Sequence, residues 1–322
     1  MMMQTKRQRQ LTPAQHRQRP PPVLACRSMR DKRAIIMLTL VFSAGLTPIA
    51  IRLAQGEGIP SLVIVWIRLC LVSLGLLPLV WTRYRQDLLW LTRRQLLLAG
   101  LAGFWLALNL LLLFVSLEYT SVLMTSLLRR TTPMWIVLPE ILIFGVVFSR
   151  RFWLSLALTL LGVAMVGLGG LTAVQAGSNP LLGGALALVG SFCFGAYLLI
   201  GRQLNNRMPP LLYSFLVFSC AAICISLAVA VTGTPISGYS LEAYLWTLTV
   251  TLMAQVLGHL GMNLALQFLR ATALAILLQV GVALSAAVAL LAFGEAPSVV
   301  QVAGGALVVY GVVVATYEQT RA

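Results

Sequence analysis

The feature that most constrains this chain is a succession of apolar runs, each long enough to cross a lipid bilayer as a helix. A membrane-spanning helix needs roughly 20 predominantly apolar residues. Ten such runs are found, at 34–53, 60–80, 95–117, 121–145, 152–170, 181–201, 210–231, 243–268, 271–294 and 298–317. Only 10% of the 322 residues are charged, whereas a soluble domain carries about 25%. We therefore predict an all-α integral membrane protein with ten transmembrane helices.

The charges of the nine connecting segments agree with this number of helices. Basic residues are found in the second, fourth, sixth and eighth connections and in none of the others. The basic connections hold Arg83, Arg85, Arg93, Arg94, Arg150, Arg151, Arg202, Arg207 and Arg270. Because cytoplasmic loops carry an excess of Lys and Arg, we expect a multi-pass protein of the cell membrane with both termini in the cytoplasm.

The net charge of +15 reflects a basic N-terminal segment more than the helices. Nine of the 23 Lys and Arg residues lie in residues 1–33, which are also rich in Gln and Pro. This composition predicts a disordered, cytosolic basic arm. Its basic residues would fit contacts with anionic lipid head groups, but a non-essential tail, or an over-extended gene start ahead of Met29, is the favoured alternative. Nucleic acid is not expected as a partner, because the remaining basic residues flank apolar runs, as membrane topology requires.

The chain also repeats itself, which indicates two related halves. A shift of 149 residues superimposes Gly145 on Gly294, Ser149 on Ser298 and Gly162 on Gly311. The halves are expected at 34–170 and 181–317, with five helices each. An odd number of helices inserts the second half upside down relative to the first. Inverted repeats of this kind are common in secondary transporters, whose substrate site lies near the middle of the membrane between the halves.

The predicted span at 121–145 carries charge that lipid alone would not tolerate. Arg129 and Arg130 lie side by side near its middle, and Glu140 follows. Each central Arg opposes insertion by about 2.5–3.5 kcal/mol, whereas each Leu, Ile, Val or Phe favours it by only about 0.3–0.6 kcal/mol. This helix therefore requires partner helices or a wet cavity, and its charges indicate a functional site.

Two long stretches then resemble a known family. LEYTSVLMTSLLRRTTPMW with FGVVFSRRFWLSLALTLLGVAMVG, and GMNLALQFLRATALAILLQVGVALSAAVALLAFGEAPSVVQVAGGALVVYGVVV, are similar to the ends of the two halves of EamA-type members of the drug/metabolite transporter superfamily. Gly294-Glu295 before a Gly-rich last helix, and Arg68 in WIRLCLVS, add to the resemblance. It covers roughly residues 34–316 and implies ten helices in two inverted repeats and transport of small organic solutes, often export.

The chain departs from that family pattern at two places. Val146 stands where the family often has Glu, the counterpart of Glu295. Gly281 and Val282 stand where a Pro is common, the counterpart of Pro133. The Arg129-Arg130 pair does not belong to the general family pattern, so its role has to be argued from its chemistry.

The predicted topology gives a depth for each polar residue at about 1.5 Å per residue. Arg68, Asn109 and Arg129 lie roughly 12 Å inside the outer helix ends. The candidate substrate-binding residues are Arg68, Trp105, Asn109, Arg129, Arg130, Tyr197, His259, Asn263 and Gln279. His259 and Asn263 share a helix face, and the proton-coupling candidates are His259 and Glu140. The topology thus predicts a basic outer layer above an aromatic and amide middle layer.

Each candidate also has a structural alternative. The guanidinium fork of Arg129 or Arg130 suits a carboxylate or phosphate, but either residue would also fit a structural pair with backbone carbonyls or with Glu118. Arg68 and His259 would equally fit hydrogen-bonded core positions. Glu140 would also fit a pair with a loop Arg at the cytosolic edge, and Trp105 and Tyr197 would fit ordinary packing.

The leading prediction is a secondary transporter that moves a small polar or anionic metabolite or an amino-acid-like solute by alternating access, with export as the direction that the family resemblance implies. A facilitative exchanger and a multidrug-type efflux carrier are the alternatives. An intramembrane enzyme is less favoured, because the sequence has no HExxH or Gly-x-Ser-x-Gly motif. No cofactor or metal is expected, since there is no phosphate-binding Gly loop and the five cysteines lack metal-ligand spacing. The oligomeric state is left open.

Overall fold

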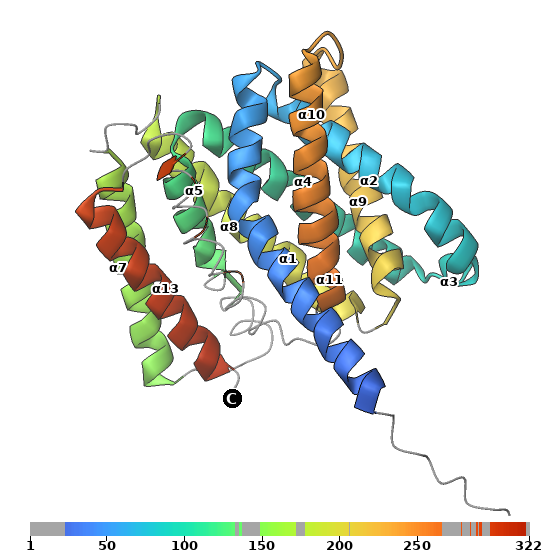
Figure 1. Ribbon diagram of the computed structural model, residues 1–322, viewed down its shortest axis with the longest axis horizontal. Coiled ribbons are helices and arrows are strands. Elements are labelled where there is room, and N and C mark those ends of the chain that lie inside the picture. Colours follow the sequence, from blue (N-terminus) through green and yellow to red (C-terminus); the bar gives the residue numbers. More distant parts are fainter. Residues whose placement is uncertain are drawn as a thin grey trace, which may run out of the picture.

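The computed structural model of the chain is a bundle of helices (Figure 1). It describes residues 23–132, 135–136, 149–171, 178–205, 207–265, 278, 284, 288, 290–291 and 297–319. The helices are α1 (Val23–Gly56), α2 (Ser61–Arg83), α3 (Arg85–Leu89), α4 (Arg93–Tyr119), α5 (Val122–Leu128), η1 (Arg129–Thr131), α7 (Arg150–Leu171), α8 (Pro180–Asn205), α9 (Pro210–Thr232), α10 (Leu241–Val250), η2 (Thr251–Leu260), α11 (Gly261–Ala265) and α13 (Val299–Gln319). Pro133, Glu140 and Gln279 lie outside the described residues, as does the side chain of Arg130.

The helices begin where the local sequence provides a cap. Before α4, the hydroxyl of Thr92 accepts from the backbone of Gln95, and the side chain of Gln95 accepts from the backbone N–H of Thr92. Ser121 caps α5 and Ser240 caps α10 in the same way, each accepting one backbone N–H. These contacts satisfy the N–H groups that a helix leaves unpaired in its first turn. Short polar sequences thus set the outer starts of α5 and α10.

The observed bounds of several helices follow the predicted segments closely. Those of α2, α4, α8 and α9 agree with the segments at 60–80, 95–117, 181–201 and 210–231 within four residues. The first helix differs, because α1 begins at Val23, within the stretch predicted as a disordered arm. Pro20, Pro21 and Pro22 precede this start. Because the next Pro is Pro48, nothing in the intervening sequence strongly opposes helix formation.

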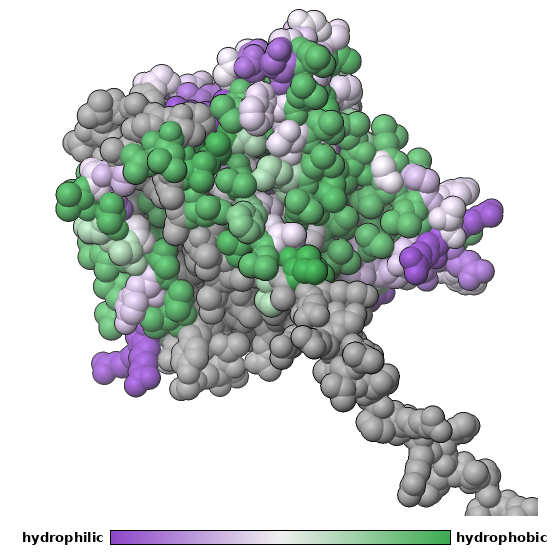
Figure 2. Space-filling model, in the orientation of Figure 1, coloured by the Kyte–Doolittle hydropathy of each residue, from purple (hydrophilic) through white to green (hydrophobic). Residues whose placement is uncertain are grey.

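Six helices among the described residues are long and apolar enough to cross a membrane. They are Ile35–Gly56, Ser61–Arg83, Arg93–Tyr119, Pro180–Gly201, Pro210–Thr232 and Leu241–Ala265. Figure 2 shows a broad hydrophobic surface over the helices, with hydrophilic residues gathered toward their ends. A surface of this kind is suited to lipid rather than to water.

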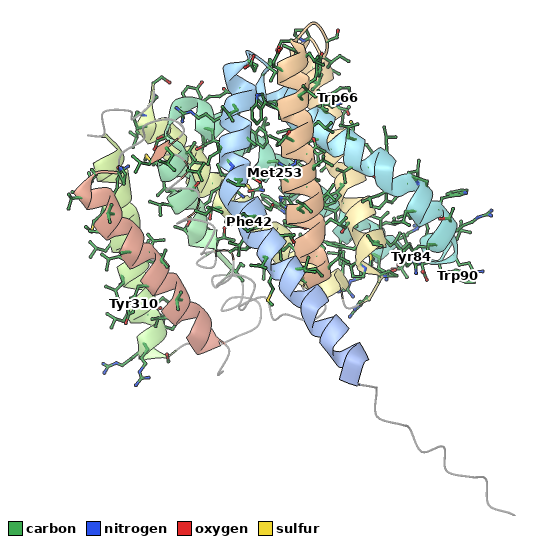
Figure 3. The ribbon with its side chains drawn as sticks, in the orientation of Figure 1. Phe42, Trp66, Tyr84, Trp90, Met253 and Tyr310 are labelled. Carbon is green, nitrogen blue, oxygen red and sulfur yellow. The ribbon has the colours of Figure 1, made fainter. Side chains whose placement is uncertain are left out.

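Large apolar side chains stand on the outside of the bundle (Figure 3). Phe42 of α1 and Tyr310 of α13 are more than half exposed. Trp90, just after the short helix α3, is 85% exposed. Trp is typical of the membrane–water interface, so α3 is well placed to lie at that boundary between α2 and α4.

The helices pack in pairs that bring distant parts of the sequence together. α4 packs against α8 and α9, α2 packs against α9, and α1 packs against α10 and η2. α13 lies along α7 at one side of the bundle (Figure 1). The two members of this last pair are equivalent under the 149-residue shift, so the two ends of the repeats pack against each other.

Two glycines make the contact between α7 and α13 close. A Cβ on Gly162 of α7 would lie 2.5 Å from the carbonyl oxygen of Gly304 in α13. A Cβ on Gly311 of α13 would lie 2.7 Å from the carbonyl oxygen of Ser155 in α7. Each helix therefore offers a glycine to the backbone of the other, as small residues do where membrane helices approach closely.

Candidate functional site

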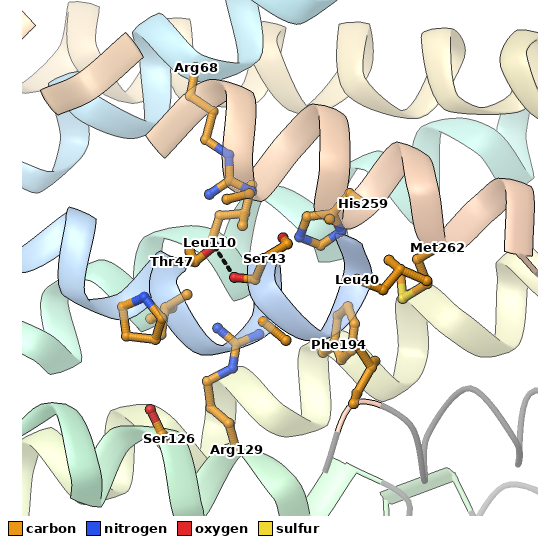
Figure 4. A pocket seen from close by; sticks show the side chains of 16 residues that line it. Leu40, Ser43, Thr47, Arg68, Leu110, Ser126, Arg129, Phe194, His259 and Met262 are labelled. Atoms are coloured by element: carbon orange, nitrogen blue, oxygen red, sulfur yellow. Dashed lines mark hydrogen bonds between the residues drawn. The ribbon is translucent and has the colours of Figure 1, made fainter. Parts of the chain in front are cut away.

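A cavity of about 160 Å³ lies inside the bundle, between α1, α2, α4, α5, α8 and η2. Its lining is mostly apolar, with two arginines, one histidine and a few hydroxyl groups (Figure 4). The lining residues are Leu40, Ser43, Ala44, Thr47, Pro48, Arg68, Leu110, Leu113, Ser126, Arg129, Phe194, Ala254, Gly258, His259, Met262 and Leu278. A mainly apolar pocket with few convergent polar groups is the usual form of a small-molecule site.

Arg68 enters the cavity from α2 and is 1% exposed. Its Nε donates a hydrogen bond of 2.7 Å to Oε1 of Gln255, and its guanidinium lies 5.9 Å from the centre of the Phe114 ring. Its Nη1 has no hydrogen-bond partner among the described residues. One edge of the guanidinium is thus fixed by Gln255, while a buried donor is left unsatisfied.

Arg129 enters from the opposite side, at the point where α5 ends and the 3₁₀ helix η1 begins (Figure 4). Its Nη2 donates to Oδ1 of Asn109 at 3.3 Å, and the guanidinium lies 5.7 Å from the centre of the Phe194 ring. The alternative pairing with Glu118 is not seen for Arg129 in the described part of the chain, where its partner is Asn109 and Glu118 accepts a hydrogen bond from Ser61. Arg129 is therefore held by a neutral amide and an aromatic ring.

The change of helix type at Arg129 is supported by α8. The hydroxyl of Ser191 lies 3.0 Å from the hydroxyls of both Thr131 and Thr132. It also donates to the carbonyl oxygen of Arg129 at 3.4 Å. A short 3₁₀ stretch within a longer helical segment often marks a hinge, and Ser191 joins this one to the opposite helix.

His259 lines the cavity from η2, a π-helical segment that continues α10. Its ring makes edge contacts with Phe194 at 5.9 Å and with Tyr197 at 6.2 Å between ring centres. Its Nδ1 is buried without a hydrogen-bond partner in the described part of the chain. Gln255, which holds Arg68, lies on the same segment, and π-helical turns are frequent at functional sites.

Most of the buried unpaired polar atoms at and beside the cavity are donors. Within the described residues they include Nη1 of Arg68, Nδ2 of Asn109 and Nε2 of Gln255, which are hydrogen-bond donors. Nδ1 of His259 is also unpaired and is a donor or an acceptor according to its protonation. No Asp or Glu is among the cavity-lining residues given above, and neither Arg68 nor Arg129 has a carboxylate partner among the described residues. Since a buried unpaired donor destabilises a fold, this excess of donors and positive charge favours an acceptor-rich, anionic ligand.

Other predicted site residues form a second polar group beside the cavity. The hydroxyl of Tyr197 donates to Oδ1 of Asn263 at 3.1 Å, and Nδ2 of Asn263 donates to Ser214 at 2.8 Å. This chain joins α8, α11 and α9, but neither Tyr197 nor Asn263 lines the cavity. Trp105 does not line it either and makes an edge contact with Phe192 at 5.7 Å. The packing interpretation therefore fits Trp105 best.

The structure thus brings together only part of the predicted site. Arg68, Arg129 and His259 meet in one cavity, and Asn109 supports Arg129. Sequence reasoning missed Gln255, although it lies four residues before His259, a spacing that places two residues on the same face of a helix. It also missed Ser43, whose hydroxyl donates to the carbonyl oxygen of Met253 at 2.6 Å and joins α1 to η2. A lone Ser in an apolar run gives no signal of this kind.

The apolar helices indicate a multi-pass membrane protein, and the cavity lies inside the helix bundle. The family model described as "EamA-like transporter family" matches the chain twice, over residues 32–168 and 181–317. These two matches cover well over half of the chain, so the protein belongs to the EamA-like transporter family and contains two EamA repeats. The predicted resemblance to this family is confirmed.

The solved structures support the fold alone. Twenty-eight chains of solved structures match. One of them, titled "Crystal structure of protein", has a TM-score of 0.59 and 18% sequence identity, and the match covers 90% of this chain and 98% of that chain. No curated protein matches the chain. The solute and the direction of transport therefore have to be argued from the cavity.

Proposed function

We propose that this protein is a secondary transporter that moves a small anionic metabolite across the cell membrane by alternating access. The observation that carries the proposal is a pair of guanidinium groups, of buried Arg68 and partly buried Arg129, which face one cavity without a carboxylate partner in the described part of the chain. Charge kept inside a membrane protein marks a substrate or ion pathway. Arg is also the residue best suited to bind carboxylate or phosphate.

The helix packing supports the inverted-repeat part of this proposal. In the ten-helix topology, α1 and α8 are the first helices of the two halves, and α4 and the α10–η2–α11 segment are the third. α1 packs against α10 and η2, and α8 packs against α4, so each first helix packs on the third helix of the other half. The second helices of the two halves, α2 and α9, pack on each other. Such reciprocal contacts are expected of two halves related by a pseudo-two-fold axis.

The same topology places the cavity well inside the membrane. Arg68 is seven residues after the first residue of α2, and Arg129 is seven residues after the first residue of α5. At 1.5 Å per residue, both α-carbons lie roughly 10 Å below the outer helix ends. The basic connections then lie in the cytoplasm together with both termini. Export, common in the family by resemblance, is the proposed direction, and His259 is the described candidate for a coupled proton.

Transport in proteoliposomes tests the function directly. Purified protein is reconstituted with a panel of small metabolites inside, and uptake of the matching radiolabelled solute is followed in counterflow. We expect carboxylates or phosphates to exchange and amines of similar size not to exchange. Exchange of amines with no exchange of any anion would contradict the proposal, and chemical conversion of the solute in detergent would instead indicate an enzyme.

The Arg129→Gln variant connects that assay to the cavity. We expect anion exchange to fall by about tenfold to a hundredfold, the range expected when a hydrogen bond between charged groups is lost. Arg83→Gln is the matched control, because Arg83 is exposed at the end of α2 and far along the helix from Arg68. Equal exchange by both variants and the native protein would remove the assigned role of Arg129.

A further inference from the structure

We infer that the solute is a short dicarboxylate that bridges Arg68 and Arg129 with one acid group at each end. This inference rests on the proposed function and narrows it to one chemical class. It draws on three features of the cavity: two arginines that enter from opposite sides, a mainly apolar lining, and the lack of an acidic group among its described lining residues.

The two guanidinium groups make separate ends of one site. Figure 4 shows Arg68 and Arg129 entering the cavity from opposite sides, and their positive charges repel each other. A single carboxylate bound to one of them would leave the other charge buried without a counterion. An uncompensated buried charge is strongly destabilising. A ligand with two acid groups provides a counterion to both arginines at once.

Most of the remaining lining is apolar. Leu110 of α4, Ala44 and Pro48 of α1 and Ala254 are among the apolar residues that line the cavity, while the hydroxyl residues Ser43 and Thr47 lie between the two arginines (Figure 4). The apolar side chains offer nothing to a phosphate or sugar but suit a short hydrocarbon linker. A cavity of about 150 Å³ is large enough to bind benzene, so a volume of about 160 Å³ suits a small organic ligand. Succinate and glutarate are small organic acids of this order of size.

The lack of an acidic lining residue separates a dicarboxylate from an amino acid. The ammonium group of a zwitterion would need a carboxylate or several acceptors, and the described lining offers only the hydroxyls of Ser43, Thr47 and Ser126 as polar side-chain acceptors besides His259. That ammonium group would also lie near the fixed positive charges of Arg68 and Arg129. Like charges at close range in a low-dielectric site repel strongly. The cavity therefore selects against the amino-acid-like solutes that the sequence left open.

A series of four-carbon probes tests this inference. Succinate, butyrate, 4-aminobutyrate and 1,4-diaminobutane have similar length and differ in the charge at each end. Their affinities are measured on the purified native protein by thermal-shift titration and by competition in counterflow. We expect succinate to bind at least about tenfold more tightly than butyrate, and 4-aminobutyrate and the diamine to bind more weakly than butyrate.

Variants of the two arginines locate the two ends. Arg68→Gln and Arg129→Gln should each reduce the preference for succinate over butyrate to within about threefold, because one acid group then has no counterion. Arg129→Lys keeps the charge and should retain a preference, which covers the case in which a Gln variant does not fold. Arg83→Gln should leave the preference unchanged.

The outcomes separate this inference from the proposed function. Equal affinity for succinate and butyrate in the native protein, with both exchanged, would overturn the dicarboxylate while the anion transporter stands. Exchange of 4-aminobutyrate or the diamine without either acid would overturn both. A preference for succinate that survives in both Gln variants would also overturn the inference, since the acid groups would then bind elsewhere.

Discussion

Arg68 and Arg129 bring the same charge to one cavity, but the backbones that carry them differ. Arg68 lies within the continuous helix α2, is 1% exposed and donates a 2.7 Å hydrogen bond to Gln255. Arg129 lies at the junction of α5 and η1, is only partly buried and donates a longer hydrogen bond of 3.3 Å to Asn109. The comparison indicates a fixed charge on α2 and an adjustable charge on the α5–η1 junction. Such a division would suit the proposed alternating access, in which one part of the bundle moves against the other.

The largest expected effect comes from giving each arginine an internal counterion. Gln255→Glu would place a carboxylate on Arg68, and Asn109→Asp would place one on Arg129. Both variants should lose anion binding by about tenfold to a hundredfold, because the ligand then meets a neutralised site. Thermal stability, followed by fluorescence-detected size exclusion on heating, should not fall and should rise for Gln255→Glu, whose bond to Arg68 is the shorter one.

The conservative nature of these two changes provides their control. Each replaces an amide by an acid of nearly the same shape, so packing is retained. A stable Gln255→Glu protein that still binds anions as tightly as the native protein would show that Arg68 is structural. The same result for Asn109→Asp alone would leave Arg68 as the main cation of the site.

A smaller effect is expected from removing the hydrogen bond that fixes Arg68. Gln255→Leu leaves the Nε of Arg68 buried and unpaired, so the free energy of unfolding should fall by about 1–3 kcal/mol. The matched change at the other arginine, Asn109→Leu, should cost less, because its bond is longer and Arg129 is more exposed. Denaturant titrations in mild detergent compare the two. A larger loss for Asn109→Leu would contradict the distinction between a fixed and an adjustable charge.

The smallest effect, and the one most specific to the hinge, is expected from Ser191→Ala. This change removes the hydroxyl that contacts Thr131, Thr132 and the carbonyl of Arg129. The rate of counterflow should change by about two- to fivefold while the affinity for the solute stays the same, because lost contacts of about 0.5–1 kcal/mol act on the α5–η1 junction and not on the site.

Ser226→Ala is the matched control for that experiment. Ser226 on α9 accepts a hydrogen bond of 2.9 Å from Trp66 on α2 and is not among the described residues that line the cavity. It should leave both rate and affinity unchanged. If Ser191→Ala weakens affinity as much as it changes the rate, the Ser191 contacts belong to the binding site and not to a hinge.

The sequence predicted the helices better than the site. Apolar runs alone predicted the bounds of α2, α4, α8 and α9 within four residues, because the thickness of the bilayer sets the length of a spanning helix. The charge of the cavity was also predictable, because an Arg within an apolar run marks a functional site. The residues that contact the cavity arginines were not predictable. Whether Asn109 or Glu118 contacts Arg129 depends on how the helices rotate and pack. A single neutral amide such as Gln255 barely changes the hydropathy of an apolar run, so the sequence pattern does not reveal it.

The predicted middle layer shows the same limit. Depth along a helix can be counted from the sequence, and it placed Trp105, Tyr197 and His259 at similar levels. Rotation about the helix axis cannot be counted in the same way when the helix is apolar all round. As a result, His259 faces the cavity, Tyr197 turns to Asn263, and Trp105 packs on Phe192.

The π-helical segment Thr251–Leu260 determines how this protein would respond to the deletion of one residue. A π-helix bonds residue i to residue i+5, one residue further than an α-helix. If one residue is deleted there, the segment can adopt ordinary α-helical hydrogen bonding. It then remains one continuous helix and is shortened by less than a turn. The side chains on either side of the deletion would then rotate relative to each other, and Gln255 and His259 would no longer face the same partners. In this stretch, a single-codon deletion should therefore preserve insertion into the bilayer and abolish solute recognition.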